Sequence, residues 1–456
     1  MFDLMIVNGT VVTEGGVSKQ NIGIQDGKIV ALWAPDVEPL VKAHRVLEAA
    51  DLFVFPGVVE PHAHIGLGGA QDWETETASA LHGGVTTVFN YVMGSESYDV
   101  QIPREHDLAT DRTYVDYGLH IVPCTEEHLA NLVDSSKTFG VNSFKYFMSF
   151  RGDEGAYLGV TGSDDGFLFE YLKVVATIPG GVACIHAENI EIVWKLRAFE
   201  RAAGHEGLDA WNRSRPDYVE AEAISRVAYL SQLSGTDTYI VHTSSERSLR
   251  EVQRIRSERR AGIDPSLYVE TCAHYLTHTE GAAQGLLAKA NPPLRSDSDR
   301  EALWHGLKSG LVNTIGSDHS ARRKELKTGS VWTSPAGIAG IGVQLSALLN
   351  FGYHDRGLPL ETIAAVSSTT PAKIFGVYPQ KGTIQTGSDA DLVLVDLAEV
   401  REVESDSWGS NAGYNLYEGM SLKGWPVTTI SRGEVVFDQG HIMVDPGSGK
   451  YLFRKG

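Results

Sequence analysis

The chain has 456 residues, of which 42% are hydrophobic and 21% are charged, and this mixture excludes a disordered or fibrous protein. The length suits one large barrel with an accessory domain. The formal net charge of −19 is dispersed along the sequence and not gathered in a tail, so we expect solubility and no nucleic-acid partner.

The first residues, "MFDLMIVNGTVV", lack the basic and then apolar layout of a secretory signal. No apolar run approaches the roughly 20 residues that span a bilayer. The three cysteines, Cys124, Cys184 and Cys272, are far apart and show no CxxC spacing. We therefore expect a cytoplasmic protein with core thiols and no membrane partner.

Both ends of the chain have the pattern of short strands and turns. Residues 1–51 carry alternating apolar residues, with Asn8-Gly9 and Asp26-Gly27 as hairpin signals. Residues 376–456 have the same character, for example in "GTIQTGSDADLVLVDL" and "VTTISRGEVVFDQGHIMV". The two segments, 1–51 plus 376–456, are predicted to combine into one small β-sandwich domain.

Between them, residues 52–375 alternate short apolar runs with amphipathic helical stretches, of which "YVEAEAISRVAYLSQL" and "SERSLREVQRIRSERR" are the clearest. The candidate strands are "LFVFPGVVEPHAH", "GVTTVFNYV", "DYGLHIVP", "NSFKYFMS", "GVACIHAE", "TYIVHTS", "LYVETCAHYL" and "VNTIGSDHS". Repeated βα units of this number predict an α/β protein with a (β/α)8 TIM barrel.

The segment after the second candidate strand, "VMGSESYDVQIPREH" at residues 92–106, shows no helical period. Loops at this end of a barrel often cover the active site. We expect a loop that acts as a lid over the barrel mouth.

The first candidate barrel strand ends in "PHAHIG", which places His62 and His64 two positions apart. Side chains at i and i+2 of a strand project to one face, so both rings could bind one metal ion. A pair of hydrogen-bonded structural histidines is the alternative, and this pair alone does not decide between the two.

Three more polar residues lie at strand ends: His186 in "CIHAEN", His242 in "IVHTSS" and Asp318 in "IGSDHS". Taken singly, each histidine fits a hydrogen-bonded core residue equally well. A carboxylate at the Asp318 position is costly unless it binds a metal or donors, or acts as a base. Because the strand ends of a barrel meet at one face, the set together favours a metal site.

Lys145, in "SFKYFMSF" on the fourth candidate strand, is a cation among these residues. A divalent metal would repel an ammonium group, so a lysine in the site must be neutral or modified. Buried lysine loses its proton readily, and a neutral amine can take up carbon dioxide to form a carbamate that bridges two metals. A salt-bridged barrel lysine is the alternative.

With these motifs the sequence resembles the cyclic amidohydrolases of the hydantoinase, dihydropyrimidinase and allantoinase group, within the amidohydrolase superfamily. The resemblance extends from residue 3 to about residue 436. The matching motifs are "PGVVEPHAH", "SFKYFM", "HAEN", "VHTSS", "NPPLRSDSDREALWHGL", "GSDHS" and "PQKGTIQTGSDADLVLVDL".

The resemblance implies two divalent metal ions, usually Zn²⁺, bridged by carboxylated Lys145 and a hydroxide. His62, His64 and Asp318 would complete one metal site, and His186 and His242 the other. Asp318 would take the proton of the hydroxide and pass it to the leaving nitrogen, as a general base that becomes a general acid. The resemblance also implies a homotetramer.

One departure from the family pattern is Phe150, five residues after the lysine, where D-hydantoinases and dihydropyrimidinases carry a tyrosine that donates to the developing oxyanion. Phenylalanine has no donor, so a hydrogen bond worth roughly 3 to 4 kcal/mol is missing or is supplied elsewhere. Tyr146 and Tyr157 are nearby, but neither has the family spacing. Packing at the barrel mouth is the simpler account of Phe150.

Other departures concern the surroundings of the metals. Glu60 stands where the family has Asp, as a supporting carboxylate that keeps this role. By resemblance, substrate contacts come from loops near Asn291, where serine is common, and near Ala336 and Gly337, where asparagine is common. Phe150, Asn291, Ala336 and Gly337 are therefore the predicted substrate-binding residues, and the preferred ring stays open.

The expected reaction is the hydrolytic opening of a cyclic amide, such as a hydantoin, a dihydropyrimidine or a related cyclic ureide or imide. An allantoinase, or a hydrolase of another lactam or of an acyclic N-acyl or N-carbamoyl compound, is the alternative that Phe150 motivates. A non-catalytic scaffold is a third reading, which the complete set of metal-ligand positions disfavours.

Overall fold

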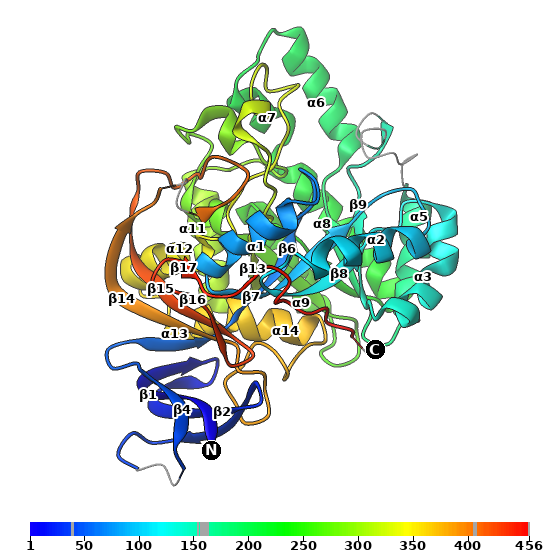
Figure 1. Cartoon of the computed structure of the whole chain (residues 1–456). Helices are drawn as coiled ribbons and strands as arrows, with labels where there is room; N and C mark the ends of the chain where they lie inside the picture. The colour runs from blue at the N-terminus through cyan, green and yellow to red at the C-terminus, as the bar shows by residue number, and fades with distance from the viewer. Residues whose placement is uncertain (38–40, 153–154, 156–163, 405–407, 455–456) are drawn as a thin grey trace.

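The computed structural model describes residues 1–37, 41–152, 155, 164–404 and 408–454. Two sheets organise the chain (Figure 1). One is an eight-stranded sheet built from the middle of the chain, and the other is a nine-stranded sheet built from its two ends.

The eight-stranded sheet runs in chain order from β6 to β13, with parallel pairing throughout. A bridge between Ala63 and His319 brings its first and last strands together, with the N–H of His64 donating to the carbonyl of His319 at 2.7 Å. The predicted (β/α)8 barrel is confirmed. Its strands are β6 (Val58–Ala63), β7 (Val85–Val92), β8 (Asp116–Ile121), β9 (Ser143–Phe147), β10 (Val182–His186), β11 (Asp237–Ile240), β12 (Leu267–Cys272) and β13 (Thr314–Gly316).

Helices separate these strands, and side-chain caps fix where several of them begin. Thr125, Asp164, Asn189, Ser245 and Ser296 each accept the backbone N–H of the residue three positions later, which satisfies a donor that has no partner within the helix. The helices as far as β13 are α1 (Asp72–His82), α2 (Tyr98–Thr110), α3 (Glu126–Phe139), α5 (Asp165–Ala176), α6 (Ile190–Ala202), α7 (Leu208–Ser214), α8 (Asp217–Ser234), α9 (Glu246–Glu258), α10 (Ala273–Thr277), η1 (Gly285–Ala288) and α11 (Asp297–Ser309).

The last helical region of the barrel alternates α-helical and π-helical turns between Gln344 and Ile374. After β13 the helical segments are η2 (Lys324–Leu326), α12 (Gln344–Ala347), η3 (Leu348–His354), α13 (Leu360–Ala364), η4 (Ala365–Thr369) and α14 (Thr370–Ile374).

The nine-stranded sheet joins the two ends of the chain at β5, which pairs with β1 in parallel and with β14 antiparallel. The predicted β unit from both termini is confirmed, and its strands form one continuous mixed sheet. They are β1 (Phe2–Thr13), β2 (Gly16–Gln25), β3 (Lys28–Trp33), β4 (Ala43–Glu48), β5 (Phe53–Pro56), β14 (Leu392–Glu402), β15 (Ser421–Ser431), β16 (Glu434–Asp438) and β17 (His441–Ile442).

Gly57 separates the two sheets in sequence, because β5 belongs to the terminal sheet and β6 to the barrel. The single strand expected at "LFVFPGVVEPHAH" is therefore wrong, since its continuous apolar pattern hides a change of sheet. A Cβ on Gly57 would overlap the Thr86 side chain, so the close approach of the backbone there requires glycine. We propose two domains that meet near Gly57 and near Phe375, the first boundary lying a few residues beyond the predicted 51/52.

Two other local predictions differ from the structure. Asp26-Gly27 does join β2 to β3, but Asn8-Gly9 lies inside β1 at a register shift, where the N–H of Asn8 donates to Oδ1 of Asn21 at 2.8 Å. The loop expected at 92–106 contains most of α2. Its buried face includes Gln101, a polar residue, and this hides the helical period from a hydrophobicity pattern.

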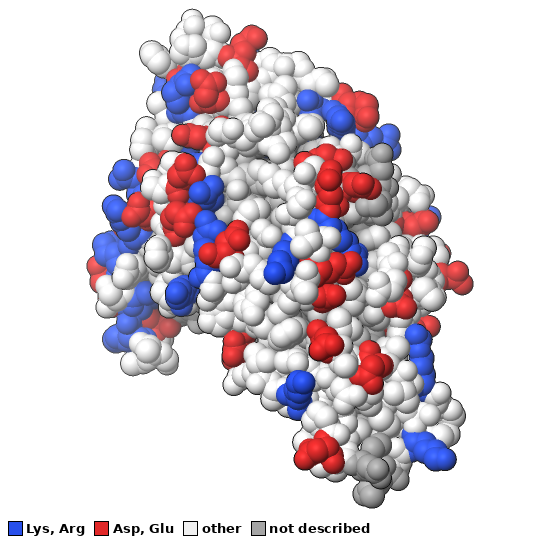
Figure 2. Space-filling view, turned by 90° about the vertical axis from the view of Figure 1, so that its left-hand side faces the viewer, with Lys and Arg blue, Asp and Glu red and all other residues white. Residues whose placement is uncertain are grey.

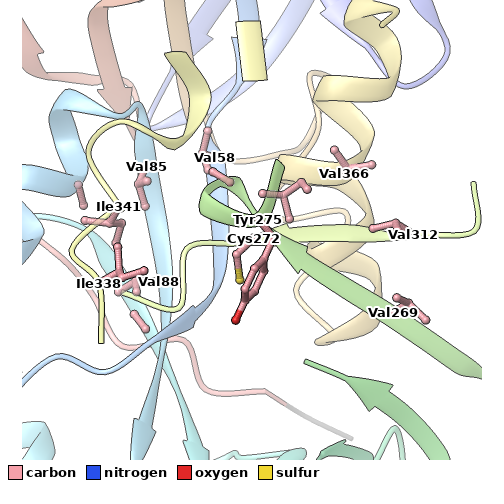
Figure 3. Close-up of a cluster of buried hydrophobic side chains, with 14 of the residues drawn as sticks. Val58, Val85, Val88, Val269, Cys272, Tyr275, Val312, Ile338, Ile341 and Val366 are labelled. Carbon is pink, nitrogen blue, oxygen red and sulfur yellow. The ribbon is translucent and has the colours of Figure 1, made fainter. Parts of the chain in front are cut away.

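The barrel packs through one extensive apolar core, part of which Figure 3 shows around Val58, Val88, Cys272 and Tyr275. On the face seen in Figure 2, acidic and basic side chains are interspersed. None of the described helices is both long and apolar enough to cross a membrane. In barrels of this kind, functional side chains gather at the carboxyl end, where the strand ends meet.

Candidate metal centre

Six polar side chains from different parts of the sequence lie at the carboxyl ends of the barrel strands. His62 lies on β6 and His64 just after it, Lys145 lies on β9, and His186 ends β10. His242 follows β11 by two residues, and Asp318 follows β13 by two residues. These are the six positions predicted as metal ligands: His62, His64, Lys145, His186, His242 and Asp318.

His62, His64 and Asp318 form a compact group. Nε2 of His62 lies 3.1 Å from Oδ1 of Asp318, and Nε2 of His64 lies 3.2 Å from the same oxygen. One ligand atom from each residue lies within 4.8 Å of the others, close enough to hold one metal ion. Burial lowers the pKa of His64 to about 4, which keeps its ring neutral and able to bind a cation.

Lys145 is completely buried beside this group, with its Nζ 3.4 Å from Nε2 of His62. The ammonium position also lies over the rings of Tyr91, at 4.5 Å, and Phe147, at 4.9 Å. Burial lowers the pKa of Lys145 to about 8, and Asp318 and Glu270 only partly oppose this shift. The amine is therefore easier to deprotonate than an ordinary lysine.

His186 and His242 lie against each other and against the first group. Their ring centroids are 4.6 Å apart, and the centroid of His242 is 5.4 Å from that of His62. Nδ1 of His242 is buried and has no hydrogen-bond partner among the described residues. A buried nitrogen without a partner is costly, and a metal ion nearby is one way to use such a ring.

The backbone at two of these residues is in an uncommon conformation. His242 has a φ of 39° and Asp318 a φ of 48°, both in the left-handed region that disfavours residues with a side chain. Strained conformations of this kind persist where the surrounding structure determines them, and they gather at functional sites. The chain thus turns sharply after β11 and after β13 to aim these two side chains inward.

Glu270 on β12 supports the site, and the sequence reasoning missed it. Its Oε1 lies 2.7 Å from Nδ1 of His62 and accepts the N–H of His242 at 2.8 Å, while its Oε2 accepts the hydroxyl of Tyr239 at 2.8 Å. The carboxylate fixes a proton on Nδ1 of His62 and leaves Nε2 free to bind a metal. An acidic residue inside the apolar run "YVETC" is the signal that could have found it.

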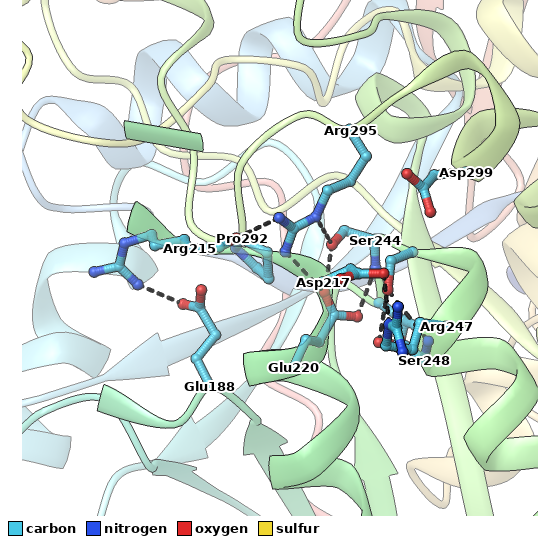
Figure 4. A network of polar contacts seen from close by, with 12 residues as sticks. Glu188, Arg215, Asp217, Glu220, Ser244, Arg247, Ser248, Pro292, Arg295 and Asp299 are labelled. Atoms are coloured by element: carbon cyan, nitrogen blue, oxygen red, sulfur yellow. Dashed lines mark hydrogen bonds and ion pairs between the residues drawn. The ribbon is translucent and has the colours of Figure 1, made fainter. Parts of the chain in front are cut away.

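Glu188, also missed, holds His186 from the other side. Its Oε2 lies 2.7 Å from Nε2 of His186. The same oxygen accepts a hydrogen bond from Arg215 at 2.7 Å (Figure 4). Burial opposes ionisation, but Arg215 and His186 lower the pKa of Glu188 to about 2. In the same region Arg295 contacts Ser244 and lies near Glu220 (Figure 4). Because Glu188 occupies Nε2 of His186, Nδ1 is the ring nitrogen that remains free to bind a metal.

Glu60 lies behind the first group, where the sequence predicts a supporting carboxylate. Its Oε1 accepts the N–H groups of His62, at 2.8 Å, and Ser317, at 3.0 Å. It thereby ties the strand that carries the histidine pair to the strand that leads to Asp318. Burial raises the pKa of Glu60 to about 8.

The ring of Phe150 packs beside His186, one of the two histidines predicted for the second metal site. It stacks on Phe147 at 4.1 Å between centroids and faces His186 at 6.4 Å. The hydroxyl of Tyr146 donates to the carbonyl of Asp164 at 2.9 Å, which directs it away from the role of an oxyanion donor. Tyr157 lies outside the described residues.

The other predicted substrate-binding residues lie on the segments that follow β12 and β13. Oδ1 of Asn291 is buried without a partner among the described residues. Ala336 is partly buried, and the N–H of Gly337 donates to the carbonyl of Lys289 at 3.0 Å. Tyr414 donates to the carbonyl of Gly337 at 3.0 Å, so the C-terminal part of the chain holds this loop.

The donor set fits divalent metal ions of the zinc type. Imidazole nitrogens and a carboxylate are the common ligands of Zn²⁺, and the buried surroundings favour tight, dry coordination. The readily deprotonated amine of Lys145 lies beside His62, so its neutral form could contribute a ligand as well. Such an arrangement can acidify a water molecule and polarise a carbonyl group.

Comparisons with known proteins agree with this geometry. A family model described as "Amidohydrolase family" matches residues 53–436. The chain is 32% identical to a D-hydantoinase of Ralstonia pickettii over 99% of both chains. It is 35% identical to an allantoinase of Solibacter usitatus, over 98% of this chain and 96% of the relative. The solved structure of an L-hydantoinase (dihydropyrimidinase) from Arthrobacter aurescens matches with a TM-score of 0.91, at 32% identity and 99% coverage of each chain.

Proposed function

Because the chain belongs to the amidohydrolase family, we propose that it is a metal-dependent hydrolase that opens a cyclic amide, such as a hydantoin, a dihydropyrimidine or a related cyclic ureide. The observation that carries the proposal is the convergence of the six side chains at the carboxyl end of the barrel. The hydantoinase and allantoinase relatives support the reaction class, since all of them match nearly the whole chain.

We propose that the six residues hold two divalent ions, with Zn²⁺ as the usual metal. His62, His64 and Asp318 would hold one ion, and His186 and His242 would hold the other. Lys145, as a carbamate, would help to hold them, and its lowered pKa of about 8 supports this role because the neutral amine is the form that reacts with carbon dioxide.

When bound, the two ions supply a water acidified to act near neutral pH and a Lewis acid for the amide carbonyl. Asp318 moves the proton. Burial opposes ionisation, but His62 and His64 hold the pKa of Asp318 well below its usual range, so the group is ionised. We propose that this carboxylate accepts a proton from the attacking water. It then donates this proton to the leaving ring nitrogen.

The surrounding residues orient these groups. Glu270 and Glu188 fix the protonated nitrogens of His62 and His186. The backbone near Asn291, Ala336 and Gly337 lines the route of the substrate. Phe150 contributes an apolar wall and no donor, so stabilisation of the developing oxyanion falls to the bound metal.

The direct test is a panel of cyclic substrates: hydantoin, 5,6-dihydrouracil, allantoin and glutarimide, with the zinc-loaded protein. We expect ring opening of at least one, its loss on chelation and its return with Zn²⁺. Asp318→Asn should lower kcat by about 10³-fold or more. Asp297→Asn, at a side chain that is 79% exposed on α11, is the matched control. A panel-wide lack of turnover with metal bound would reject the proposal.

A second candidate keeps the same centre and changes the substrate to allantoin, another lactam, or an acyclic N-acyl or N-carbamoyl compound. Two observations favour it: Phe150 in place of a tyrosine, and the allantoinase relative at 35% identity. Turnover of such a compound together with inertness toward hydantoin and dihydrouracil would select this candidate.

By the same resemblance we propose a homotetramer and a cytoplasmic location. Light scattering of the purified protein tests the first, and fractionation of the source cells tests the second. A non-catalytic scaffold is disfavoured because all six ligand positions carry side chains that can bind metal.

A further inference from the structure

Residues 447–454 return to the barrel at the end opposite the candidate metal centre, alongside the first residues of β8. The N–H of Tyr117 donates to the carbonyl of Lys450 at 2.9 Å, and the N–H of Leu452 donates to the carbonyl of Tyr117 at 2.7 Å. The side chain of Leu452 belongs to an apolar cluster with residues of β6, β7, β10 and β11. The segment is thereby fixed at the amino end of the barrel.

Arg454 places a buried guanidinium group between β8 and β9. The residue is 4% exposed. Its Nη2 donates to the carbonyl of Leu119 on β8, and its Nη1 donates to Oγ of Ser143 on β9 at 2.7 Å. Ile121 opposite Phe144 is the only pair in the ladder of these two strands among the described residues. The arginine therefore joins the strands just before their own backbone pairing begins.

The hydrogen bonds continue from Ser143 to His120. Oγ of Ser143 lies 2.6 Å from Nδ1 of His120, and Nε2 of His120 lies 3.0 Å from the carbonyl oxygen of Pro61. Burial lowers the pKa of His120 well below its ordinary value, so the ring is neutral and carries one proton. A carbonyl oxygen can only accept, so this proton is on Nε2, and Nδ1 accepts the hydroxyl of Ser143. Because arginine can only donate, each hydrogen bond is donated in the direction from Arg454 to Pro61.

The peptide group at the end of this chain of hydrogen bonds carries His62, a proposed metal ligand. His120 donates to the carbonyl oxygen of this peptide, which belongs to Pro61. The N–H of the same peptide belongs to His62 and donates to Oε1 of Glu60 at 2.8 Å. The ring of Tyr91 stacks on His120 at 4.4 Å and meets that of His62 edge-on at 4.8 Å between centroids. Since the peptide plane is held from both sides, the direction of the His62 side chain is fixed as well.

A seal at the amino end of the barrel needs only apolar side chains such as Leu452. A buried guanidinium is costly unless its donors are used, and here one of them leads toward a proposed metal ligand. We propose that Arg454 is a positioning residue for the candidate metal centre. It acts through Ser143 and His120 on the peptide that carries His62. This inference rests on the proposed function, because it concerns the metal affinity of the same site.

The test measures the Kd for Zn²⁺ by competition with a chelator, which requires no substrate. Arg454→Met keeps most of the length of the side chain and removes its donors, and we expect the Kd to rise by about 10-fold. His120→Phe keeps a ring and removes the donor to Pro61, with an expected rise of about 10- to 100-fold. Arg454→Lys keeps a buried donor and should recover part of the loss.

Lys450→Met is the matched control, because it also changes a cation to methionine on the same segment, but at an exposed side chain. It should leave the Kd for Zn²⁺ unchanged. The Co²⁺-loaded protein gives a second measurement, since its visible absorption bands depend on the arrangement of the ligands. These bands should shift in Arg454→Met and His120→Phe and stay unchanged in Lys450→Met.

Tm is measured for every variant, because a purely structural role for Arg454 would lower Tm alone. A wild-type Kd and wild-type Co²⁺ bands in both Arg454→Met and His120→Phe would overturn the positioning role. If Arg454→Met does not fold, Arg454→Lys and His120→Phe decide in the same way. A wild type that binds no Zn²⁺ rejects the proposed function together with this inference, whereas unchanged variants of a zinc-binding wild type reject this inference alone.

Discussion

Two lysines, Lys145 and Lys381, are completely buried in this protein, and their surroundings drive their pKa values in opposite directions. Lys145 lies among histidines at the barrel mouth, and burial lowers its pKa to about 8. Lys381 lies between the barrel and the terminal sheet, where burial acts against the charge but Asp391, Asp116 and Asp389 together raise its pKa well above the usual value. The neighbours, and not the depth of burial, decide which lysine stays charged.

The surroundings of Lys381 are balanced in charge. Its Nζ contacts Asp116 at 2.5 Å, Asp391 at 2.7 Å and Asp389 at 3.0 Å. Arg432 also pairs with Asp116, and Lys28 pairs with Asp389 at 2.5 Å. The three aspartates could geometrically hold a metal ion, but the lysine ammonium already occupies that role. At the barrel mouth, Asp318 instead pairs with His62 and His64, and no lysine or arginine among the described residues forms an ion pair with it.

Removal of Lys145 tests most directly whether this lysine, unlike Lys381, has a functional role. Lys145→Ala should lower kcat for the preferred substrate by about 10³-fold or more, because it deletes a proposed ligand of the metals. The variant should also lose bound metal, as measured by elemental analysis. Wild-type turnover in this variant would contradict the proposed centre, and added short-chain carboxylic acids that restore activity would support it.

Removing Lys381 should instead damage stability. Lys381→Met leaves three buried carboxylates short of a cation, and we expect a loss of about 3 to 5 kcal/mol in the free energy of unfolding. Denaturant unfolding measures this loss. Metal content and kcat of the folded fraction should remain near wild type. A selective loss of kcat at unchanged stability would contradict the assignment of a structural role to Lys381 and a functional role to Lys145.

A substitution at Glu188 tests the support of the candidate metal centre with a smaller expected effect. Glu188→Gln keeps the size of the side chain but weakens the contacts with His186 and Arg215, so kcat or zinc affinity should fall by about 10- to 100-fold. Competition with a zinc chelator separates the two effects. Glu191→Gln, on the exposed start of α6, is the control.

The smallest effect concerns acid stability near Lys381. Burial opposes ionisation, but Lys381 and Lys28 hold the pKa of Asp389 below its usual value in the folded protein. The stabilisation from this group is therefore present above the unfolded pKa, near 3.8, and is lost as the pH falls through the folded pKa. The free energy of unfolding, followed from pH 6 to pH 3, should fall less steeply in Asp389→Asn than in wild type.

The sequence predicted the barrel and the positions of the six polar residues because both leave local signals. Apolar runs that end in histidine or aspartate can be recognised from the sequence alone, as at His186 and Asp318. Glu270 and Arg215 were missed because their roles depend on partners 208 and 27 residues away, His62 and Glu188.

The errors in the fold have physical causes of the same kind. The helix α2 was expected to be a loop because Gln101 is buried although it is polar. The change of sheet at Gly57 was hidden because the apolar run continues from β5 into Val58 and Val59 at the start of β6. Asn8-Gly9 fits a turn, but pairing with β2 turns it into a bulge. In each case a tertiary contact overrides the local pattern.

The bridge between Ala63 and His319 has a consequence for how the protein is made. Translation delivers five of the six clustered side chains by residue 242, but Asp318 arrives only with the last strand, whose pairing to the first closes the ring. A nascent chain that ends before the eighth strand therefore carries five of these groups but cannot close the ring. The six side chains can gather at one face of the barrel only after the eighth strand has left the ribosome and paired with the first.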